Sequence, residues 1–237
     1  CGLDTSGTAF CWGGNASGQL GDGTATPRNV PTPVAGGLTF TEIAVRPGHT
    51  CAVAQGGAPY CWGSNAFGEL GDGTTTSRTM PTLVAGGLSL RSVSVSFRHS
   101  CGLDASGAAF CWGANSLGQL GDGTTTMRTT PVAVLGGLTF ADISAAGEHT
   151  CGTTTGGTLY CWGENTTGQV GDGSTVSPTV PVPVAGALTF VDAAAGGSHS
   201  CGVTGGGVAY CWGLNNLGQL GDGTKQKRLT PTRVTTP

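Results

Sequence analysis

The ten cysteines have the spacing with the clearest chemical meaning. They form five pairs with nine residues inside each pair, and the pairs recur every 50 residues. Reduced thiols could serve as small core residues, whereas structural zinc sites use shorter Cys-x-x-Cys knuckles. Joining the second Cys of one pair to the first of the next would leave Cys1 and Cys211 unpaired. We predict five local disulfides: Cys1 with Cys11, Cys51 with Cys61, Cys101 with Cys111, Cys151 with Cys161, and Cys201 with Cys211.

A turn between the two cysteines supports this local pairing. Position 7 of every copy is glycine: Gly7, Gly57, Gly107, Gly157 and Gly207. A three-residue loop built on a type I turn, with this glycine in the left-handed conformation, places position 1 opposite position 11. Directly opposed residues of antiparallel strands are close enough for a disulfide. Because disulfides persist in oxidising compartments, we expect a secreted or cell-surface protein.

Histidine also recurs once per copy, always followed by Thr or Ser: His49, His99, His149 and His199. A ring of histidines could converge on a metal. Each one belongs to a different copy, however, so we favour structural hydrogen bonds and expect neither a metal nor another cofactor.

One aspartate per copy lies between two glycines: Asp22, Asp72, Asp122, Asp172 and Asp222. Calcium needs several clustered oxygen ligands, so we favour a turn in which each Asp accepts backbone N–H groups. The other acids, such as Glu69, Glu148 and Glu164, are scattered and form no evident catalytic pair. The sequence also lacks a Gly-x-Ser-x-Gly elbow and a phosphate loop with Lys. We therefore predict that the protein is not an enzyme.

Aromatic pairs accompany the second cysteine of each copy. Trp12, Trp62, Trp112, Trp162 and Trp212 follow an aromatic two residues earlier: Phe10, Tyr60, Phe110, Tyr160 and Tyr210. Residues two apart share one face of a strand, so core packing is the favoured interpretation. A carbohydrate-binding lectin is a third functional hypothesis, and it requires some of these rings to be exposed.

Basic residues suggest one loop as a surface for a partner. Arginine recurs after the Gly-Asp-Gly-Thr segment at Arg28, Arg78, Arg128 and Arg228, and Pro178 replaces it in the fourth copy. Lys225 and Lys227 enlarge this group near the end of the chain. We predict a candidate partner-binding loop made of Arg28, Arg78, Arg128, Lys225, Lys227 and Arg228, with a solvated terminus as the alternative for the last three.

Two Asn-x-Ser/Thr sequences are candidate glycosylation acceptors, at Asn15 and Asn165. The threonine-rich segments 24–26, 74–76 and 124–126 are candidates for O-linked sugars, with random occurrence of such short motifs as the competing explanation.

Composition excludes several classes of protein. The 237 residues include 45 Gly and 12 Pro, about a quarter of the chain, which indicates many turns. The net charge of −3 offers no positive field for a polyanion, so we expect no nucleic-acid partner. Apolar stretches are short and interrupted, so we expect no membrane span.

The 50-residue period predicts propeller blades or a solenoid. The copies are 1–50, 51–100, 101–150, 151–200 and an incomplete 201–237, and we expect residues 1–237 to form a single repeat domain. Within a copy, residues 38–50 predict one strand, the two Cys segments predict a hairpin, and a shorter fourth strand is expected near 30–34. The fold class is therefore all-β, with four-stranded antiparallel blades stacked on one another.

The repeated segment Cys-Trp-Gly-x-Asn-x-x-Gly-Gln-Leu-Gly-Asp-Gly-Thr, together with the His-Ser or His-Thr pair, resembles the regulator-of-chromosome-condensation repeat. The resemblance implies a β-propeller of four-stranded blades, seven of them in familiar members. It also implies a binding surface, because members serve as exchange factors, chromatin binders or protein inhibitors. The paired cysteines resemble secreted bacterial versions of the repeat, and only five copies are present.

These observations favour a non-catalytic extracellular binding or scaffold module of propeller type, which recognises a protein partner through its loops. The sequence shows no strand ahead of Cys1 equivalent to 38–50, so we expect a piece of a longer propeller, a five-bladed ring with one incomplete blade, or an open stack. The open stack provides the alternative function, a structural subunit of an extracellular fibre that assembles with copies of itself end to end.

Overall fold

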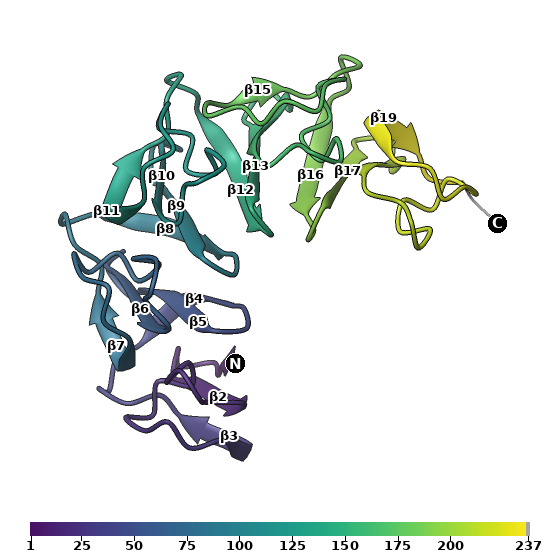
Figure 1. The fold of residues 1–237 in the computed structure, drawn as a ribbon. Helices are drawn as coiled ribbons and strands as arrows, with labels where there is room; N and C mark the ends of the chain where they lie inside the picture. The colour runs from purple at the N-terminus through teal and green to yellow at the C-terminus, as the bar shows by residue number, and fades with distance from the viewer. Residues whose placement is uncertain (236–237) are drawn as a thin grey trace. The chain divides into compact units, whose positions relative to one another are not determined.

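The computed structural model describes residues 1–235, which form nineteen β-strands and, within that range, no helix. The strands make one three-stranded sheet and four four-stranded sheets, and each four-stranded sheet uses consecutive strands in chain order (Figure 1). This is the all-β, blade-like architecture that the repeat predicts. Each four-stranded sheet takes its first strand from the end of one copy and the other three from the next.

The first sheet contains β1 (Gly2–Leu3), β2 (Ala9–Gly13) and β3 (Arg28–Pro33). The second contains β4 (Phe40–Val45), β5 (His49–Ala54), β6 (Pro59–Gly63) and β7 (Arg78–Leu83). The third contains β8 (Leu90–Val95), β9 (His99–Asp104), β10 (Ala109–Gly113) and β11 (Arg128–Ala133). The fourth contains β12 (Phe140–Ala146), β13 (His149–Thr154), β14 (Leu159–Gly163) and β15 (Val182–Pro183). The fifth contains β16 (Phe190–Ala195), β17 (His199–Thr204), β18 (Ala209–Gly213) and β19 (Arg228–Arg233).

The central hairpins have the register that the turn glycines predict. Cys51 lies directly opposite Cys61 in the pair formed by β5 and β6. The turn glycine Gly57 has a φ of 90° and donates its N–H to the carbonyl of Ala54, 2.9 Å away. A residue with a β-carbon would be strained in this left-handed conformation. All ten cysteines form disulfides in the local pairing, with Cα atoms 4.0 to 4.1 Å apart.

The prediction of one strand over 38–50 is wrong, because the chain turns inside that segment. β4 ends at Val45, and β5 begins at His49. The N–H of Arg46 bonds to the carbonyl of His49 across the turn, at 3.2 Å. His49 therefore starts the hairpin strand and pairs with Gly63 instead of ending the strand before it.

The outer strand of each sheet, meaning the edge strand that comes last in the chain, contains proline. Proline cannot donate a ladder hydrogen bond and is tolerated at sheet edges. β3 contains Pro31 and Pro33, for example. The fourth copy has the shortest of these outer strands, since Pro178 occupies the position at which β3, β7, β11 and β19 begin with arginine.

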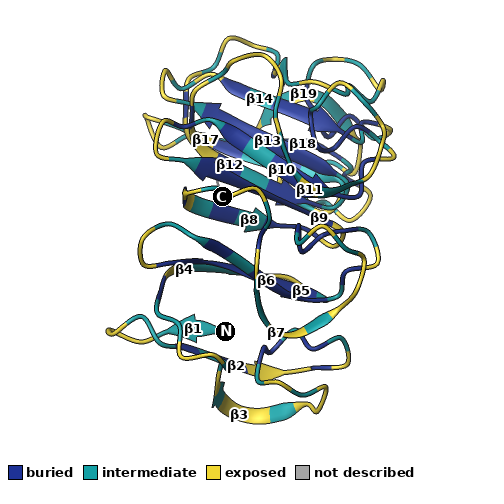
Figure 2. Cartoon of the chain, turned by 90° about the vertical axis from the view of Figure 1, so that its left-hand side faces the viewer, coloured by how far each residue is buried: buried dark blue, intermediate teal, exposed yellow. Residues whose placement is uncertain are grey.

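The chain divides into two compact units. The first comprises Cys1–Ser106, Phe110–Ala114 and Met127–Val132, and the second comprises Gly107–Ala109, Asn115–Thr126 and the chain from Ala133 on. In the first unit a core cluster gathers Cys51, Cys61, Leu70, Val93 and Trp112 with their neighbours. In the second unit an equivalent cluster is formed by Cys151, Cys161, Val170, Phe190, Ala195, Trp212 and their neighbours. The hairpin strands are mostly buried, and exposure is concentrated in the connecting loops and outer strands (Figure 2).

Removing one disulfide should lower the free energy of unfolding measurably. Each disulfide closes a short loop, with a sequence separation of 10, which in the chain-entropy model is worth roughly 2 to 3 kcal/mol. We expect the double variant Cys101→Ala with Cys111→Ala to lose that much unfolding free energy in urea titrations. An unchanged unfolding midpoint would contradict a stabilising role for this disulfide.

Candidate functional site

Neighbouring copies are joined at one backbone carbonyl, that of position 19 of each copy. The carbonyl of Gln19 accepts a hydrogen bond from Trp62 Nε1 at 3.0 Å and another from Thr50 Oγ1 at 2.9 Å. Thr50 lies on β5 and Trp62 on β6, so both donors belong to the next sheet. The same pair of bonds recurs in the first unit at Glu69, and in the second unit at Gln119 and Gln169. The position-19 carbonyls of the first four copies are therefore each used twice by the next sheet.

A buried asparagine shapes the loop that carries this carbonyl. Asn15 Oδ1 accepts the N–H of Leu20 at 2.9 Å, and its Nδ2 donates to the carbonyls of Thr24 and Thr26 at 3.0 Å. One side chain therefore joins the two ends of the loop. Asn65, Asn115, Asn165 and Asn215 make the equivalent bonds.

A glycine allows this loop to pack closely against the tryptophan of the following copy. Gly71 has a φ of 69°, and a β-carbon there would lie 2.8 Å from both Cδ1 and Nε1 of Trp112. Such a distance is far below a normal contact, so the position excludes any side chain. The glycine therefore fixes how closely one copy approaches the next.

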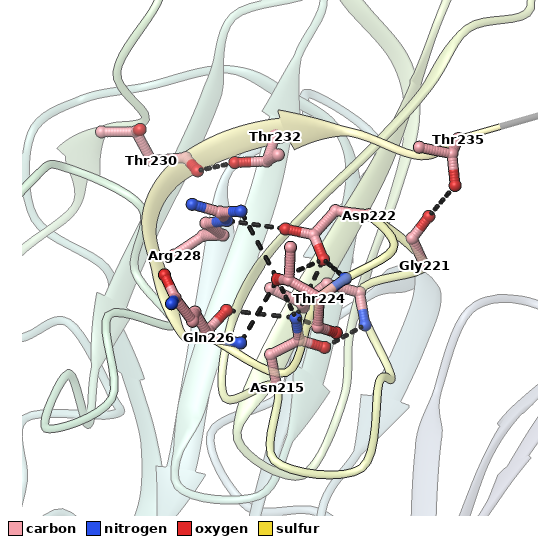
Figure 3. Close-up of polar contacts among 10 residues, drawn as sticks. Asn215, Gly221, Asp222, Thr224, Gln226, Arg228, Thr230, Thr232 and Thr235 are labelled. Carbon is pink, nitrogen blue, oxygen red and sulfur yellow. Dashed lines mark hydrogen bonds and ion pairs between the residues drawn. The ribbon is translucent and has the colours of Figure 1, made fainter.

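The recurring aspartate closes the same loop, as the turn interpretation predicts. Asp222 Oδ1 accepts the N–H of Thr224 at 2.9 Å and its hydroxyl at 2.7 Å, while Oδ2 pairs with Arg228 Nε at 2.7 Å (Figure 3). Asp22 and Asp72 pair with Arg28 and Arg78 in the same way. Burial alone would raise the pKa of Asp22, but hydrogen bonds from Thr24 and Arg28 hold that pKa at about 2. Among residues 1–235, no group of three or more His, Cys, Asp or Glu side chains is arranged to hold a metal ion.

Three arginines of the predicted partner-binding loop are ion-paired within the loop. The side chains of Arg28, Arg78 and Arg228 are only about one third exposed, and each is held by its aspartate. Lys225 and Lys227 are exposed beside the last pair, and Arg128 occupies the equivalent position of the third copy. The sequence motif reported the charge correctly but could not show that its counter-ion lies six residues earlier.

The burial of Asn15 and Asn165 corrects their interpretation as glycosylation acceptors. Asn15 and Asn165 are fully buried, and both amide nitrogens donate to backbone carbonyls. A sugar on Nδ2 would displace those bonds and would have no space in the folded chain. The two asparagines belong to the loop scaffold, like their counterparts in copies without the acceptor motif.

The histidines link adjacent sheets through hydrogen bonds. His49 Nε2 lies 2.8 Å from Ser100 Oγ, and the Ser100 hydroxyl donates to the carbonyl of Glu69 at 2.9 Å. The histidine must therefore donate, which places its proton on Nε2. His149 makes the same bond to Ser200. Burial lowers the pKa of His49 to about 4, and burial together with the nearby His199 lowers that of His149 to about 3.

Four of the five tryptophans are fully buried, namely Trp62, Trp112, Trp162 and Trp212, and Trp12 is 48% exposed. Phe40 packs against both Tyr60 and Trp62, with ring centroids 6.4 and 5.9 Å apart. These contacts show the core packing that the aromatic pairs predict. A lectin that used one ring from every copy has no exposed faces available in the last four.

Sequence reasoning missed the loop network of Asn15, Leu20 and Gly21. The signal was present, because Asn15, Gly18 and Gly21 have identical counterparts in all five copies. The position-19 carbonyl itself could not be found in this way, since a backbone acceptor leaves no trace in residue type.

A family model described as the RCC1-like domain matches residues 1–237. Among curated proteins, none matches the chain. Within residues 1–235 there is no helix with the length and apolar character needed to cross a membrane.

Several solved structures share the fold. Human WBSCR16 is 22% identical, with a TM-score of 0.86 over 96% of this chain and 62% of the other. Prp20p of Saccharomyces cerevisiae, whose structure was described together with its binding to Gsp1p and histones, is 21% identical, with a TM-score of 0.85 over 100% and 61%. The ectodomain of the Physcomitrella patens receptor kinase CR4 is 26% identical, with a TM-score of 0.54 over 78% and 44%. The chain thus spans about three fifths of the length of the first two.

The contact between glycine and tryptophan can be tested with a matched pair of glycines. Gly71 and Gly87 have φ values of 69° and 64°, but only Gly71 has Trp112 above it, and Gly87 has nothing within 4 Å of a built β-carbon. Gly87→Ala should cost about 1 kcal/mol for the left-handed backbone alone. Gly71→Ala should cost about 1 to 3 kcal/mol more in urea unfolding, because it also overpacks the contact. Equal costs would show that the ring contact is unimportant.

The buried His49 should make stability depend on pH. Its pKa is about 4 in the folded chain, against 6.5 when exposed, so the unfolded chain takes up a proton first as the pH falls. The stabilisation is complete above pH 6.5 and is lost down to about pH 4, with a slope of at most about 1.4 kcal/mol per pH unit. His49→Gln keeps a donor for Ser100 and cannot titrate, so its unfolding free energy should fall less steeply over this window. Parallel curves for the two proteins would rule out His49 as a source of the slope.

Proposed function

Because the chain belongs to the RCC1-like domain family, we propose that it is a non-catalytic extracellular module that binds a protein partner through its loops. The observation that carries this proposal is the use made of the repeated polar residues. The constant Asn, Asp, His, Ser or Thr and Trp positions are buried or hydrogen-bonded within the scaffold, and they hold one copy against the next. The exposed residues that vary between copies are therefore the groups left to recognise a partner.

Two observations support the extracellular location. Every cysteine is in a disulfide, a state that persists in oxidising compartments. The chain also resembles the ectodomain of a plant receptor kinase, which is a part of that protein outside the cell. We propose that residues 1–237 act as one repeat domain that is secreted or displayed on the cell surface.

The proposal can be tested by adding the labelled, oxidised chain to intact cells of the source organism. We expect saturable binding that unlabelled chain competes away and that protease treatment of the cell surface abolishes. Binding that survives protease but is lost after glycosidase treatment would contradict a protein partner and favour a lectin. A chain that sediments as a polymer at micromolar concentration would contradict a discrete module and favour the fibre.

A further inference from the structure

The internal repeat separates the phenylalanines that build the scaffold from those that do not. Of the seven, five occupy position 10 or position 40 of a copy: Phe10, Phe110, Phe40, Phe140 and Phe190. The other two are Phe67 and Phe97, whose equivalents are never aromatic. The residues equivalent to Phe67 in the other copies are Ser, Leu or Thr, and those equivalent to Phe97 are Pro or Gly. The fold does not require an aromatic side chain at either position.

Both exceptional residues adjoin Arg98 in the first unit, Phe67 through its ring and Phe97 as the preceding residue of the chain. The Arg98 guanidinium carbon lies 4.6 Å from the centroid of the Phe67 ring, in a cation–π arrangement. Phe97 precedes Arg98 in the turn between β8 and β9, and its side chain is 56% exposed. We call Phe67, Phe97 and Arg98 the Phe97 patch.

The turn that presents the patch is held by a side chain that its counterparts lack. Ser96 Oγ accepts the N–H of Arg98 at 3.2 Å and that of His99 at 3.1 Å, and it lies 2.6 Å from His99 Nδ1. The corresponding residues are Arg46, Ala146 and Gly196. Ordering an exposed turn before binding reduces the entropy that binding would otherwise cost.

The loop beneath Phe67 departs from the repeat as well. Glu69 replaces the glutamine found in the other four copies, and it is buried. Its Oε2 accepts the N–H of Phe67 at 2.7 Å, while its Oε1 accepts the Ser64 hydroxyl at 2.8 Å. The second bond ties the loop to Ser64, whereas in the fourth copy Gln169 Oε1 accepts both of its bonds from Thr167. Side-chain bonds therefore hold the backbone of the loop at Phe67 and the backbone of the turn that follows Phe97.

We propose that the Phe97 patch binds an acidic, apolar peptide segment of the protein partner, an inference that rests on the proposed function. Phe97 and Arg98 are exposed neighbours in the chain, and aromatic residues and arginine are enriched at protein interfaces relative to the rest of the surface. The ring of Phe97 takes an apolar side chain, and the cation of Arg98 selects a neighbouring carboxylate. The occupant is therefore a segment with Asp or Glu next to Leu, Phe or Trp.

A library of random short peptides, displayed on phage and selected on the oxidised chain, tests this assignment. We expect the enriched peptides to place Asp or Glu beside a large apolar residue. Synthetic copies should bind at least about tenfold more weakly to Phe97→Ala and to Arg98→Glu, as expected when a central interface residue is lost. Arg46→Glu, which changes the charge of the equivalent turn in the preceding copy, should bind as the unchanged chain does. Phe97→Ala should unfold at the same temperature as the unchanged chain, because the Phe97 side chain is exposed. Arg98→Glu also loses the contact with the Phe67 ring, so its unfolding temperature is measured before the affinities are compared.

Three results would overturn the assignment: no enriched peptide, a basic or uncharged consensus, or equal affinity for the patch variants and the unchanged chain. The cell-binding assay separates this failure from failure of the proposed function. If Phe97→Ala and Arg98→Glu still bind cells as the unchanged chain does, the function stands and the patch is not its contact. If the unchanged chain does not bind at all, the function itself has failed.

Discussion

The backbone carbonyl of position 19 is the acceptor on which the stacking of one copy against the next depends. It receives an indole N–H and a hydroxyl from the next sheet, so both donors are buried with their hydrogen bonds satisfied. An unsatisfied buried donor costs about 1 to 3 kcal/mol, which makes a shifted stacking expensive at every contact of this kind. The buried asparagine, the ion-paired aspartate and the left-handed glycines all serve to hold this carbonyl at one position.

Each hairpin is stabilised by means that do not require its neighbours, whereas each loop is complete only when a neighbour covers it. The disulfide and the turn glycine fix the register within a hairpin. The tryptophan and the histidine then find their partners in adjacent copies. This arrangement is typical of a repeat protein, in which the stability is the sum of the intrinsic stability of each copy and the contacts between neighbouring copies. Phe97, which has no aromatic counterpart in the other copies, lies in an exposed turn.

The sequence predicts the parts of this structure that depend on residue type and short spacing. The cysteine pairs and the glycine at position 7 were enough to predict the hairpin register, and the 50-residue period predicted the blades. Residues 38–50 were misassigned as one strand because their apolar pattern continues through a turn that Arg46 and His49 close by backbone bonds. The motif at Asn15 predicts a glycosylation acceptor because it gives residue type but not burial, and the motif at Arg28 does not show the ion pair with Asp22. The Phe97 patch needed coordinates, since Phe67 and Arg98 are far apart in the sequence.

The central claim can be tested most directly by hydrogen exchange at the tryptophan indoles, followed by proton NMR in D₂O. Four of the five indole N–H groups are buried and donate to a position-19 carbonyl, whereas Trp12 is 48% exposed. We predict four slowly exchanging indole signals and one that disappears within the dead time. Rapid exchange of all five would contradict the account, because it would show that these carbonyl bonds do not hold the copies together.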